Sequence, residues 1–326
     1  MDYIRPILQI DAARPQDAQA LGWCWFTHVE VLRRDAASRV VPVADISPYA
    51  LALLTRPRAD FGGLSMDRPR VVGILNVTPD SFSDGGRFNT VDTALAQARA
   101  MQGADILDIG GESTRPGAVF VETAEEIART APVIAAIRAA GIKTLISLDT
   151  RKSAVVVAGG ADIVNDVSAM TFDAQMARVV SGAQCPVILM HAQGTPQTMQ
   201  TDPQYGDVLL DVYDFLVERI NVAVATGIAR DRIAVDPGIG FGKTIAHNLA
   251  LLHRISLFHS LGCPILLGAS RKKFIGAIGG EPRLAGSLAV ALAGVAQGIQ
   301  MLRVHDVDET ISALALGQAV RQGQQP

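Results

Sequence analysis

The stretch GILNVTPDSFSDGG, residues 73–86, joins an apolar run to a dense series of turn formers, hydroxyls and carboxylates. Such small polar residues add nothing to a core, but they let backbone N–H groups approach an anion closely. The glycine pair at its end offers a backbone hinge. The stretch therefore predicts a ligand-binding loop after a buried strand, and we expect this loop to order and close when a charged ligand binds.

Polar residues also follow the other apolar runs of the chain. In sequence order these ends are Asn76, the Gly-Gly-Glu-Ser-Thr-Arg segment 110–115, Asp149, Asn165 with Asp166, His191, Asp236, the Ser-Arg-Lys segment 270–272, and Arg303 with His305. A single aspartate after a strand is commonly a helix cap. Caps do not require arginine and lysine at the same rim, so the set as a whole predicts a binding site.

The residue types indicate what this site could bind. Asp149, Asn165 and Asp236 offer fixed acceptors and donors that suit a flat, nitrogen-rich heterocycle with an amino-amide edge. Lys272 and Arg303 offer donors to a ring carbonyl, a ring nitrogen or an anion. Asn76, the Thr-Pro-Asp-Ser segment 78–81 and the Ser-Thr-Arg segment 113–115 would form a phosphate cradle.

The elements that must position these residues follow one pattern. Continuous apolar runs rich in Ile, Val and Leu indicate parallel strands buried on both faces. Amphipathic stretches at 93–102, 124–140 and 207–225 lie between such runs and indicate helices. The runs are 71–76, 104–111, 144–149, 161–166, 186–191, 232–236, 264–270 and 301–305.

Eight such units over about 250 residues predict an α/β protein with a (β/α)₈ barrel in residues 71–326. A doubly wound open sheet is the alternative fold. Polar residues at the carboxyl end of every run favour the barrel, because active sites of barrels lie at that rim. Residues 1–70 do not follow the pattern. They contain both tryptophans, and we interpret them as an N-terminal extension of unclear role, such as a small strand–helix unit packed on the barrel.

Composition limits the remaining possibilities. The chain has 326 residues, 49% of them hydrophobic, and a net charge of −3, which favours a globular protein without a nucleic-acid footprint. Three scattered cysteines indicate a reducing compartment, and together with the lack of a signal-peptide pattern they predict a cytoplasmic protein. The most apolar stretch, 287–302, is interrupted by Gln297, so we expect a buried or dimer-forming helix and no membrane span.

Three motifs have competing interpretations. The segment PGIGFGKT, 237–244, ends like a P-loop, but Pro237 stands where that pattern needs glycine, so we expect its glycines to permit a tight turn beside a ligand and Phe241 to offer a ring face. His191 and His305 could be metal ligands, although hydrogen-bonded rim histidines fit their isolated spacing better. Cys185 and Cys263 precede strands and fit core packing.

The motifs GILNVTPDSFSDGG, DIGGESTRPGA, SLDTRK, IVNDVSA, LMHAQG, DPGIGFGK, GASRKKFIG and RVHDV, in this order, resemble those of the dihydropteroate synthase family over residues 71 to about 320. The resemblance implies condensation of 6-hydroxymethyl-7,8-dihydropterin pyrophosphate with p-aminobenzoate, giving 7,8-dihydropteroate and pyrophosphate, in folate synthesis. It also implies an SN1-like path and Mg²⁺ as cofactor. The implied partners are the two small-molecule substrates and a second copy of the chain in a homodimer.

The same resemblance assigns residues to the substrates. It implies a pterin pocket of Asp149, Asn165, Met190, Asp236, Lys272 and Arg303. It implies a pyrophosphate site of Asn76, Thr114, Arg115, Arg303 and His305, with Asn76 at the metal. It implies a p-aminobenzoate pocket of Phe82, Thr114, Pro116, Phe241 and Ser270. The implied catalytic residues are Asp84, Asp149, Lys272 and Arg303.

Two other functions remain for such a chain. A pterin-binding methyltransferase domain would share the barrel but would not need the Ser-Thr-Arg-Pro and Ser-Arg-Lys motifs. A non-catalytic barrel would have lost rim residues such as Asp149 or Lys272. The intact motifs favour the synthase over both alternatives.

Overall fold

A parallel sheet of eight strands forms the centre of the computed structural model, which describes residues 1–78 and 87–323 and, for 87–90, the backbone alone. The strand order is β11-β10-β9-β8-β7-β6-β13-β12, and a parallel bridge between Val235 and Ile265 joins the two outer strands into a closed barrel. The predicted (β/α)₈ barrel is confirmed, and the open sheet is excluded. The strands are β6 (Arg70–Asn76), β7 (Ile106–Gly110), β8 (Leu145–Asp149), β9 (Ile163–Asp166), β10 (Val187–Met190), β11 (Ile233–Asp236), β12 (Leu266–Leu267) and β13 (Met301–Val304).

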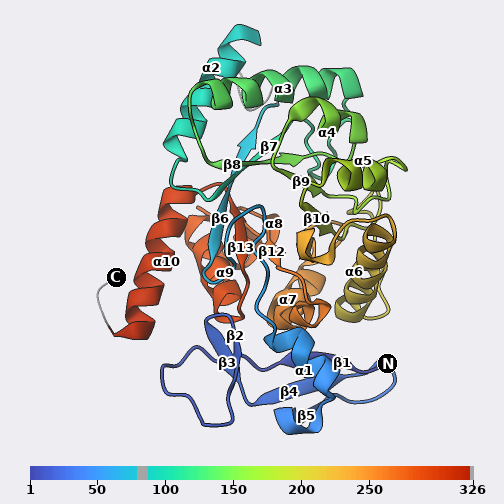
Figure 1. The fold of residues 1–326 in the computed structure, drawn as a ribbon, viewed down its shortest axis with the longest axis vertical. Helices are drawn as coiled ribbons and strands as arrows, with labels where there is room; N and C mark the ends of the chain where they lie inside the picture. The colour runs from blue at the N-terminus through green and yellow to red at the C-terminus, as the bar shows by residue number, and fades with distance from the viewer. Residues whose placement is uncertain (79–86, 324–326) are drawn as a thin grey trace.

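Helices surround the barrel, and the three predicted amphipathic stretches fall on α2, α3 and α6 (Figure 1). Over the described part of the chain, no helix is both long enough and apolar enough to cross a bilayer. The helices are α2 (Arg87–Ala100), α3 (Thr123–Ala139), α4 (Ser153–Gly159), α5 (Met176–Ala183), α6 (Val208–Ala225), α7 (Ile245–His253), α8 (Lys273–Gly279), α9 (Leu284–Ala296) and α10 (Val307–Gln322), with 3₁₀ turns η3 (Arg230–Arg232) and η4 (Ile255–Leu261).

The barrel interior changes from apolar to polar along the strands. At the amino-terminal end, one residue from each strand forms a dry layer around Phe61, whose side chain is fully buried. This layer contains Val72, Ile106, Leu145, Ile163, Ile188, Ala234, Leu266 and Met301. Side chains two residues further along a strand point to the same side of the sheet. The next inward positions are therefore mostly polar, and they line the carboxyl-terminal mouth.

Residues 1–60 form a separate layer at the end of the molecule away from α2 and α3 (Figure 1). An antiparallel sheet of β1 (Tyr3–Pro6), β4 (His28–Leu32) and β5 (Arg39–Pro42) lies beside a hairpin of β2 (Gln19–Leu21) and β3 (Cys24–Phe26), a 3₁₀ turn η1 (Val43–Asp45) and α1 (Pro48–Thr55). Buried Glu30 pairs with Arg5 and with Arg254 of the barrel, and Trp23 Nε1 donates to the Val295 carbonyl. This layer is thus fixed to the barrel by both polar and apolar contacts.

Candidate active site

The second inward layer of the barrel brings together side chains from strands that are distant in sequence. Its members include the buried residues Asp108, Ser147, Asn165, Met190 and Asp236 and the partly buried Arg303, β6 contributes the apolar Ile74, and Asp149 lies two residues beyond Ser147. Ile74 is partly buried, and Asp149 is buried. Gly268 leaves space there, because a Cβ on it would lie 3.7 Å from Asp236 Oδ2 and 3.8 Å from the Arg303 side chain.

Arg303 is the centre of this layer. Its Nε donates to Asp108 Oδ2 at 2.6 Å, and its Nη2 donates to Asp149 Oδ2 at 2.7 Å. Asn165 Nδ2 donates to both oxygens of Asp108, at 3.2 and 3.4 Å. Burial and the two carboxylates act on Arg303 in opposite directions, and the carboxylates prevail, so the pKa of Arg303 is raised and it stays cationic. The structure therefore brings Asp149, Asn165 and Arg303 together, as predicted for a binding pocket.

Asp149 has one carboxylate oxygen that accepts no hydrogen bond from the described part of the protein. This oxygen is Oδ1, and it is buried. Burial, opposed by Arg303, raises the pKa of Asp149 to about 7. An orphaned acceptor in a buried site is expensive unless a ligand donor completes it. This oxygen is therefore a suitable acceptor for a ligand N–H.

Asp236 and Lys272 line the other side of the mouth. Asp236 Oδ1 accepts from the Gly238 N–H at 2.7 Å, and burial raises the Asp236 pKa. Lys272 Nζ lies 4.0 Å from the centroid of the Phe241 ring, a cation–π contact. Burial, opposed by Asp236, lowers the pKa of Lys272 to about 7. Lys272 can thus exchange a proton near neutral pH.

The glycine-rich loop 237–242 depends on positive φ angles, as predicted. Gly238 has φ +68°, and a Cβ there would lie 1.8 Å from the His191 carbonyl oxygen. Gly240 has φ +83°, and its Cβ would lie 3.0 Å from Lys272 Cδ. A side chain at Gly238 would clash with the His191 backbone, and one at Gly240 would press on the Lys272 side chain. The expected ring face is also present, because Phe241 already receives the Lys272 ammonium.

Lys243 is not a phosphate-binding P-loop lysine. It is buried, and its Nζ donates to the Phe241 carbonyl at 3.0 Å and lies 2.9 Å from His191 Nδ1. Burial lowers the pKa of Lys243 well below its usual value and that of His191 to about 2. His191 is therefore a neutral, hydrogen-bonded rim histidine, as the sequence indicated.

A second polar group forms beside Arg303 at the mouth. His305 Nδ1 lies 3.1 Å from Ser270 Oγ, and His305 Nε2 lies 3.3 Å from Arg115 Nη2. The His305 backbone N–H also donates to Ser270 Oγ at 3.2 Å. Burial and the neighbouring arginines lower the pKa of His305 to about 4. The group combines a neutral imidazole, a hydroxyl and an exposed guanidinium, which suits an anion.

Other predicted residues lie around this mouth. Asn76 ends β6 opposite Gly110, and a Cβ on Gly110 would lie 3.7 Å from Asn76 Oδ1 and 3.5 Å from Asp149 Cβ. Met190 ends β10 beside Gly238. Thr114 is partly exposed and Pro116 is exposed, and both lie on the loop between β7 and α3. The predictions for Phe82 and Asp84, and for closure of the loop that carries them, lie outside the described residues.

The sequence interpretation missed two buried residues of this site, Asp108 and Lys243. Asp108 interrupts the apolar strand ILDIG two residues after Ile106, so the period of two already places it inside the barrel. The P-loop-like pattern around Lys243 indicates no role for this lysine, but its place directly after a tight glycine loop indicates contact with that loop. Asp166 stabilises the turn that follows β9, because its carboxylate accepts from the Ser168 and Met170 N–H groups.

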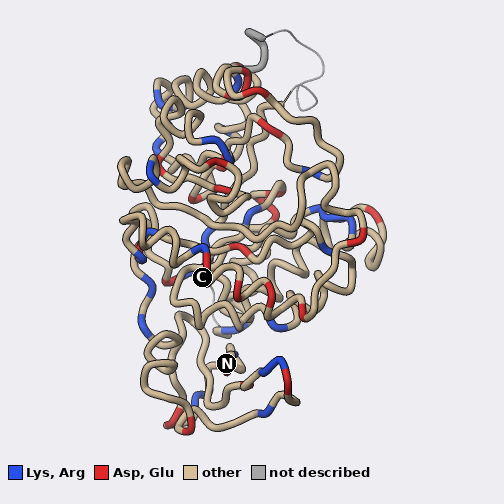
Figure 2. The backbone as a smooth tube through the Cα atoms, turned by 90° about the vertical axis from the view of Figure 1, so that its right-hand side faces the viewer, with Lys and Arg blue, Asp and Glu red and all other residues tan. Residues whose placement is uncertain are grey.

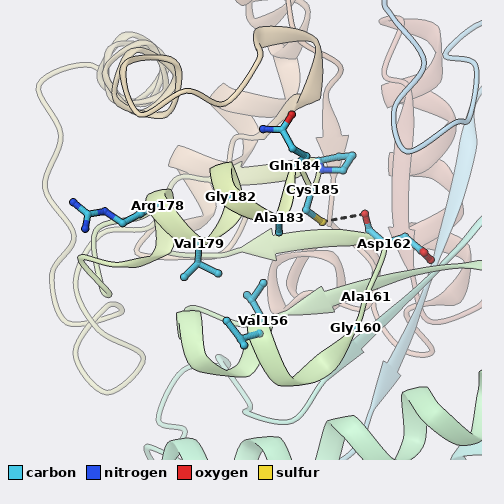
Figure 3. A pocket seen from close by; sticks show the side chains of 12 residues that line it. Val156, Gly160, Ala161, Asp162, Arg178, Val179, Gly182, Ala183, Gln184 and Cys185 are labelled. Carbon is cyan, nitrogen blue, oxygen red and sulfur yellow. Dashed lines mark hydrogen bonds between the residues drawn. The ribbon is translucent and has the colours of Figure 1, made fainter.

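A surface cavity of about 600 Å³ lies elsewhere, between α4 and α5, near the residues that lead into β9 and β10 (Figure 3). Cys185, expected in the core, is only partly buried and lines this cavity, with Sγ 3.1 Å from the Asp162 carbonyl oxygen. Cys263 is buried, as expected. The cavity is at the amino-terminal side of these strands and contains none of the predicted site residues.

The described residues contain no group of three or more His, Cys, Asp or Glu side chains that could hold a metal ion by themselves. Acidic and basic residues are interspersed along the backbone in Figure 2.

The mouth combines carboxylates, an amide, and Lys and Arg donors in a barrel. The fold and the mouth define a barrel protein whose carboxyl-terminal rim suits a polar heterocycle and an anion.

Comparisons with known proteins show the family to which the chain belongs. Residues 72–305 match the family model "Pterin binding enzyme". The chain is 46% identical over 271 residues to dihydropteroate synthase of Neisseria meningitidis serogroup B, covering 79% of this chain and 94% of that protein. It is 44% identical over 264 residues to the Escherichia coli K12 enzyme, covering 78% and 93%. The solved Xanthomonas albilineans dihydropteroate synthase with 4-aminobenzoic acid has 45% identity and a TM-score of 0.75, covering 81% of this chain and 98% of that one. The chain belongs to the dihydropteroate synthase family of pterin-binding transferases, which act in folate synthesis.

Proposed function

We propose that this protein condenses 6-hydroxymethyl-7,8-dihydropterin pyrophosphate with p-aminobenzoate to give 7,8-dihydropteroate and pyrophosphate. The observation that carries the proposal is the buried Asp149 Oδ1, which has no partner among the described residues, on a carboxylate that Arg303 holds in place inside the polar layer of the barrel. In this reaction the methylene C–O bond breaks, pyrophosphate leaves, a C–N bond forms and the amine loses a proton.

The pterin would bind in the second inward layer. Asp149, Asn165 and Asp236 present oxygens to the N–H groups of the ring, and Lys272 donates to a ring carbonyl or nitrogen. Met190 would pack on the ring, and Arg303 would lie against its face. Asp149, Asp236 and, in the loop outside the described residues, Asp84 would balance positive charge on the pterin methylene if pyrophosphate leaves first, as in an SN1-like path. The buried position of the carboxylates strengthens this effect.

Pyrophosphate would bind where Arg303, His305 and Arg115 lie close to Thr114 and Asn76. The His305 imidazole is neutral, so the charge at this end comes from the two arginines. Asn76 would offer an amide oxygen to Mg²⁺, a cation that commonly uses few protein ligands together with substrate phosphates. When bound, Mg²⁺ supplies positive charge to the departing phosphates.

p-Aminobenzoate would bind between the Phe241 ring, Ser270, and the loop residues Thr114 and Pro116, with Phe82 from the loop outside the described residues. A related structure is described as Xanthomonas albilineans dihydropteroate synthase with 4-aminobenzoic acid, and another as the Yersinia pestis enzyme with a sulfonamide drug. Lys272 lies against Phe241, so it is placed between the pterin layer and this pocket. This position suits a residue that contacts both substrates.

A homodimer in the cytoplasm completes the proposal. The outer face of α9 exposes Ala285, Ala289 and Ala293 at a spacing of four residues, and α10 exposes Leu316 and Val320. Such a face suits helix packing between two copies. Sedimentation at micromolar concentration tests this part, and a monomer would contradict it.

Release of pyrophosphate tests the reaction itself. We expect release only when both substrates and Mg²⁺ are present, with one dihydropteroate formed per pyrophosphate. Pyrophosphate release without p-aminobenzoate would indicate simple hydrolysis. Methyl transfer from a methylated pterin, with no dihydropteroate formed, would instead favour the methyltransferase alternative.

A further inference from the structure

Four buried charged residues lie behind the loop that follows β7. They are Glu112, Glu126, Arg151 and Lys152, and we call them the loop clamp. Arg151 donates to both oxygens of Glu112 at 3.0 and 3.2 Å. Lys152 Nζ lies 3.2 Å from Glu112 Oε2 and is hydrogen-bonded to Glu126 Oε2. The two carboxylates and two cations balance, and the surrounding charge lowers the pKa of Glu112 despite its burial.

The loop clamp is hydrogen-bonded to the backbone of Val121, at the carboxyl-terminal end of loop 113–120. The Val121 N–H donates to Glu112 Oε1 at 3.0 Å, and Lys152 Nζ donates to the Val121 carbonyl at 2.7 Å. Glu112 itself lies two residues after Gly110, the last residue of β7. The clamp therefore ties the two stems of loop 113–120 to each other and to the residues that directly follow β8.

Aromatic rings cover the clamp from outside. The Arg151 guanidinium lies 4.1 Å from the Phe172 centroid and 5.8 Å from that of Phe120, and Lys152 Nζ lies 4.6 Å from the Phe120 centroid. Phe120 belongs to the loop, so it also fixes the loop to these cations. Yet Val119 and Phe120 remain exposed.

Apolar burial holds the rest of this loop only weakly. Arg115, Pro116, Gly117 and Val119 are exposed, and two hydrogen bonds attach the tip to the β10–α6 connection. These are Gly117 N–H to the Pro196 carbonyl, 2.8 Å, and Gln197 Nε2 to the Ala118 carbonyl, 2.9 Å. A segment with so few buried contacts takes its position mainly from its polar anchors.

We propose that Lys152 is a positioning residue for the second substrate, acting through the Val121 carbonyl to place Thr114 and Pro116. This inference rests on the proposed function, which assigns those two loop residues to p-aminobenzoate. Buried ion pairs add little net stability compared with apolar residues of the same size. Their presence here is explained by geometry, because they hold a polar backbone group that an apolar side chain would leave without a partner.

The alternative is a purely structural role, in which the loop clamp only joins α3 and α4 to the barrel. A double substitution separates the two roles. Lys152→Met alone leaves Glu126 buried without its cation and is expected to lower Tm. Adding Glu126→Leu removes that stranded charge, and the remaining Glu112–Arg151 pair stays neutral, so Tm should recover. The Val121 carbonyl still lacks its donor in the double variant.

The measurement is the KM for p-aminobenzoate, compared with the affinity for 6-hydroxymethylpterin, which has no phosphates to contact the loop. We expect the double variant to raise the KM at least about tenfold, a loss of roughly one hydrogen bond to a charged group, with pterin affinity within about twofold of wild type. Lys152→Arg alone keeps a cationic donor at this position, so its KM for p-aminobenzoate should lie between those of wild type and the double variant. A KM that returns to the wild-type value together with Tm would overturn the proposal.

Arg70→Met is the matched control. Arg70 is similarly buried and pairs with Asp105, but at the amino-terminal end of the barrel. It should lower Tm without changing the KM for p-aminobenzoate. The two proposals fail differently: a wild-type protein that makes no dihydropteroate refutes the proposed function, whereas an active wild type with an unchanged KM in the double variant refutes only the positioning role.

Discussion

Arg303 on β13 and Asp149 on β8 are joined by a 2.7 Å ion pair, although two other strands separate β13 from β8 in the sheet. The pair therefore crosses the barrel interior. Asp108 of β7 takes the second guanidinium position at 2.6 Å. Through this arrangement one cation fixes two carboxylates in place while leaving Asp149 Oδ1 available to a ligand.

Removing this cation should damage both activity and stability. Arg303→Met leaves two buried carboxylates without their partner, which typically costs about 3–5 kcal/mol. We expect kcat/KM to fall by about 2–4 kcal/mol in transition-state terms, or roughly 30- to 1000-fold. Pyrophosphate release and thermal unfolding measure the two effects. Arg138→Met, which breaks the Arg138–Asp162 pair outside the mouth, should leave kcat/KM near wild type.

Asp149 should destabilise the fold at neutral and higher pH. Its pKa in the folded protein, about 7, lies above the usual aspartate value of 3.8, so the unfolded chain releases this proton first as pH rises. The contribution of this carboxyl to stability is therefore greatest below about pH 4 and is lost as the pH rises to about 7, an effect on the order of a few kcal/mol at 1.36 kcal/mol per pKa unit. Asp149→Asn should raise Tm at pH 8 but not at pH 4, while activity is lost. Equal Tm values for both proteins at pH 8 would contradict this.

The dependence of kcat/KM on pH should be a narrow bell centred near pH 7. Ionised Asp149 is needed, so activity falls as pH drops below about 7, and protonated Lys272 is needed, so activity falls above about 7. Lys272→Arg keeps its proton and should extend activity to higher pH, with an unchanged acid limb. Lys272→Ala should lose about 2–4 kcal/mol of transition-state stabilisation at all pH values. An alkaline limb that Lys272→Arg does not move would exclude Lys272 as its source.

Much of this fold follows from local sequence. Each strand is a continuous apolar run ended by polar residues, so its burial on both faces and its functional end can be predicted together. Even β12, only Leu266–Leu267, falls inside the predicted run 264–270. Phe61 could not be predicted to fill the barrel floor, because its segment carries no strand or helix pattern and its burial depends on the closed barrel.

The site was less predictable than the fold. Residues at strand ends, such as Asp149 and Asp236, are identified by position alone. The ion pair between Arg303 and Asp149 depends on barrel closure and strand register, which the sequence pattern does not specify. The Lys243 contact with His191 likewise depends on a turn of positive-φ glycines that brings two loops together.

Sulfonamides should inhibit by competing with p-aminobenzoate and not with the pterin substrate. They resemble the aniline, and their anionic group would take the place of the carboxylate near Ser270 and loop 113–120. Phe241→Ala should raise the inhibition constant and the KM for p-aminobenzoate in parallel, by roughly 3- to 10-fold for one aromatic contact. Initial rates at several concentrations of each substrate decide this. Competition against the pterin substrate would refute the proposed pocket.

Asn76 should control the dependence of activity on Mg²⁺. It ends β6 within the mouth, near Gly110 and Asp149, and its amide oxygen is the neutral acceptor proposed for the metal. Because phosphates would supply other ligands, loss of this oxygen should weaken metal use without abolishing it. We expect Asn76→Ala to raise the half-activating Mg²⁺ concentration about tenfold, equivalent to about 1.4 kcal/mol, and saturating Mg²⁺ to restore part of kcat. Asn221→Ala, an exposed change on α6, is the control and should follow the wild-type Mg²⁺ curve. Binding of 6-hydroxymethylpterin without phosphates should be nearly unchanged in Asn76→Ala, since that ligand does not need the metal. If the Mg²⁺ curves of Asn76→Ala and wild type coincide, Asn76 is not a metal ligand, and its position at the strand end serves only the shape of the mouth.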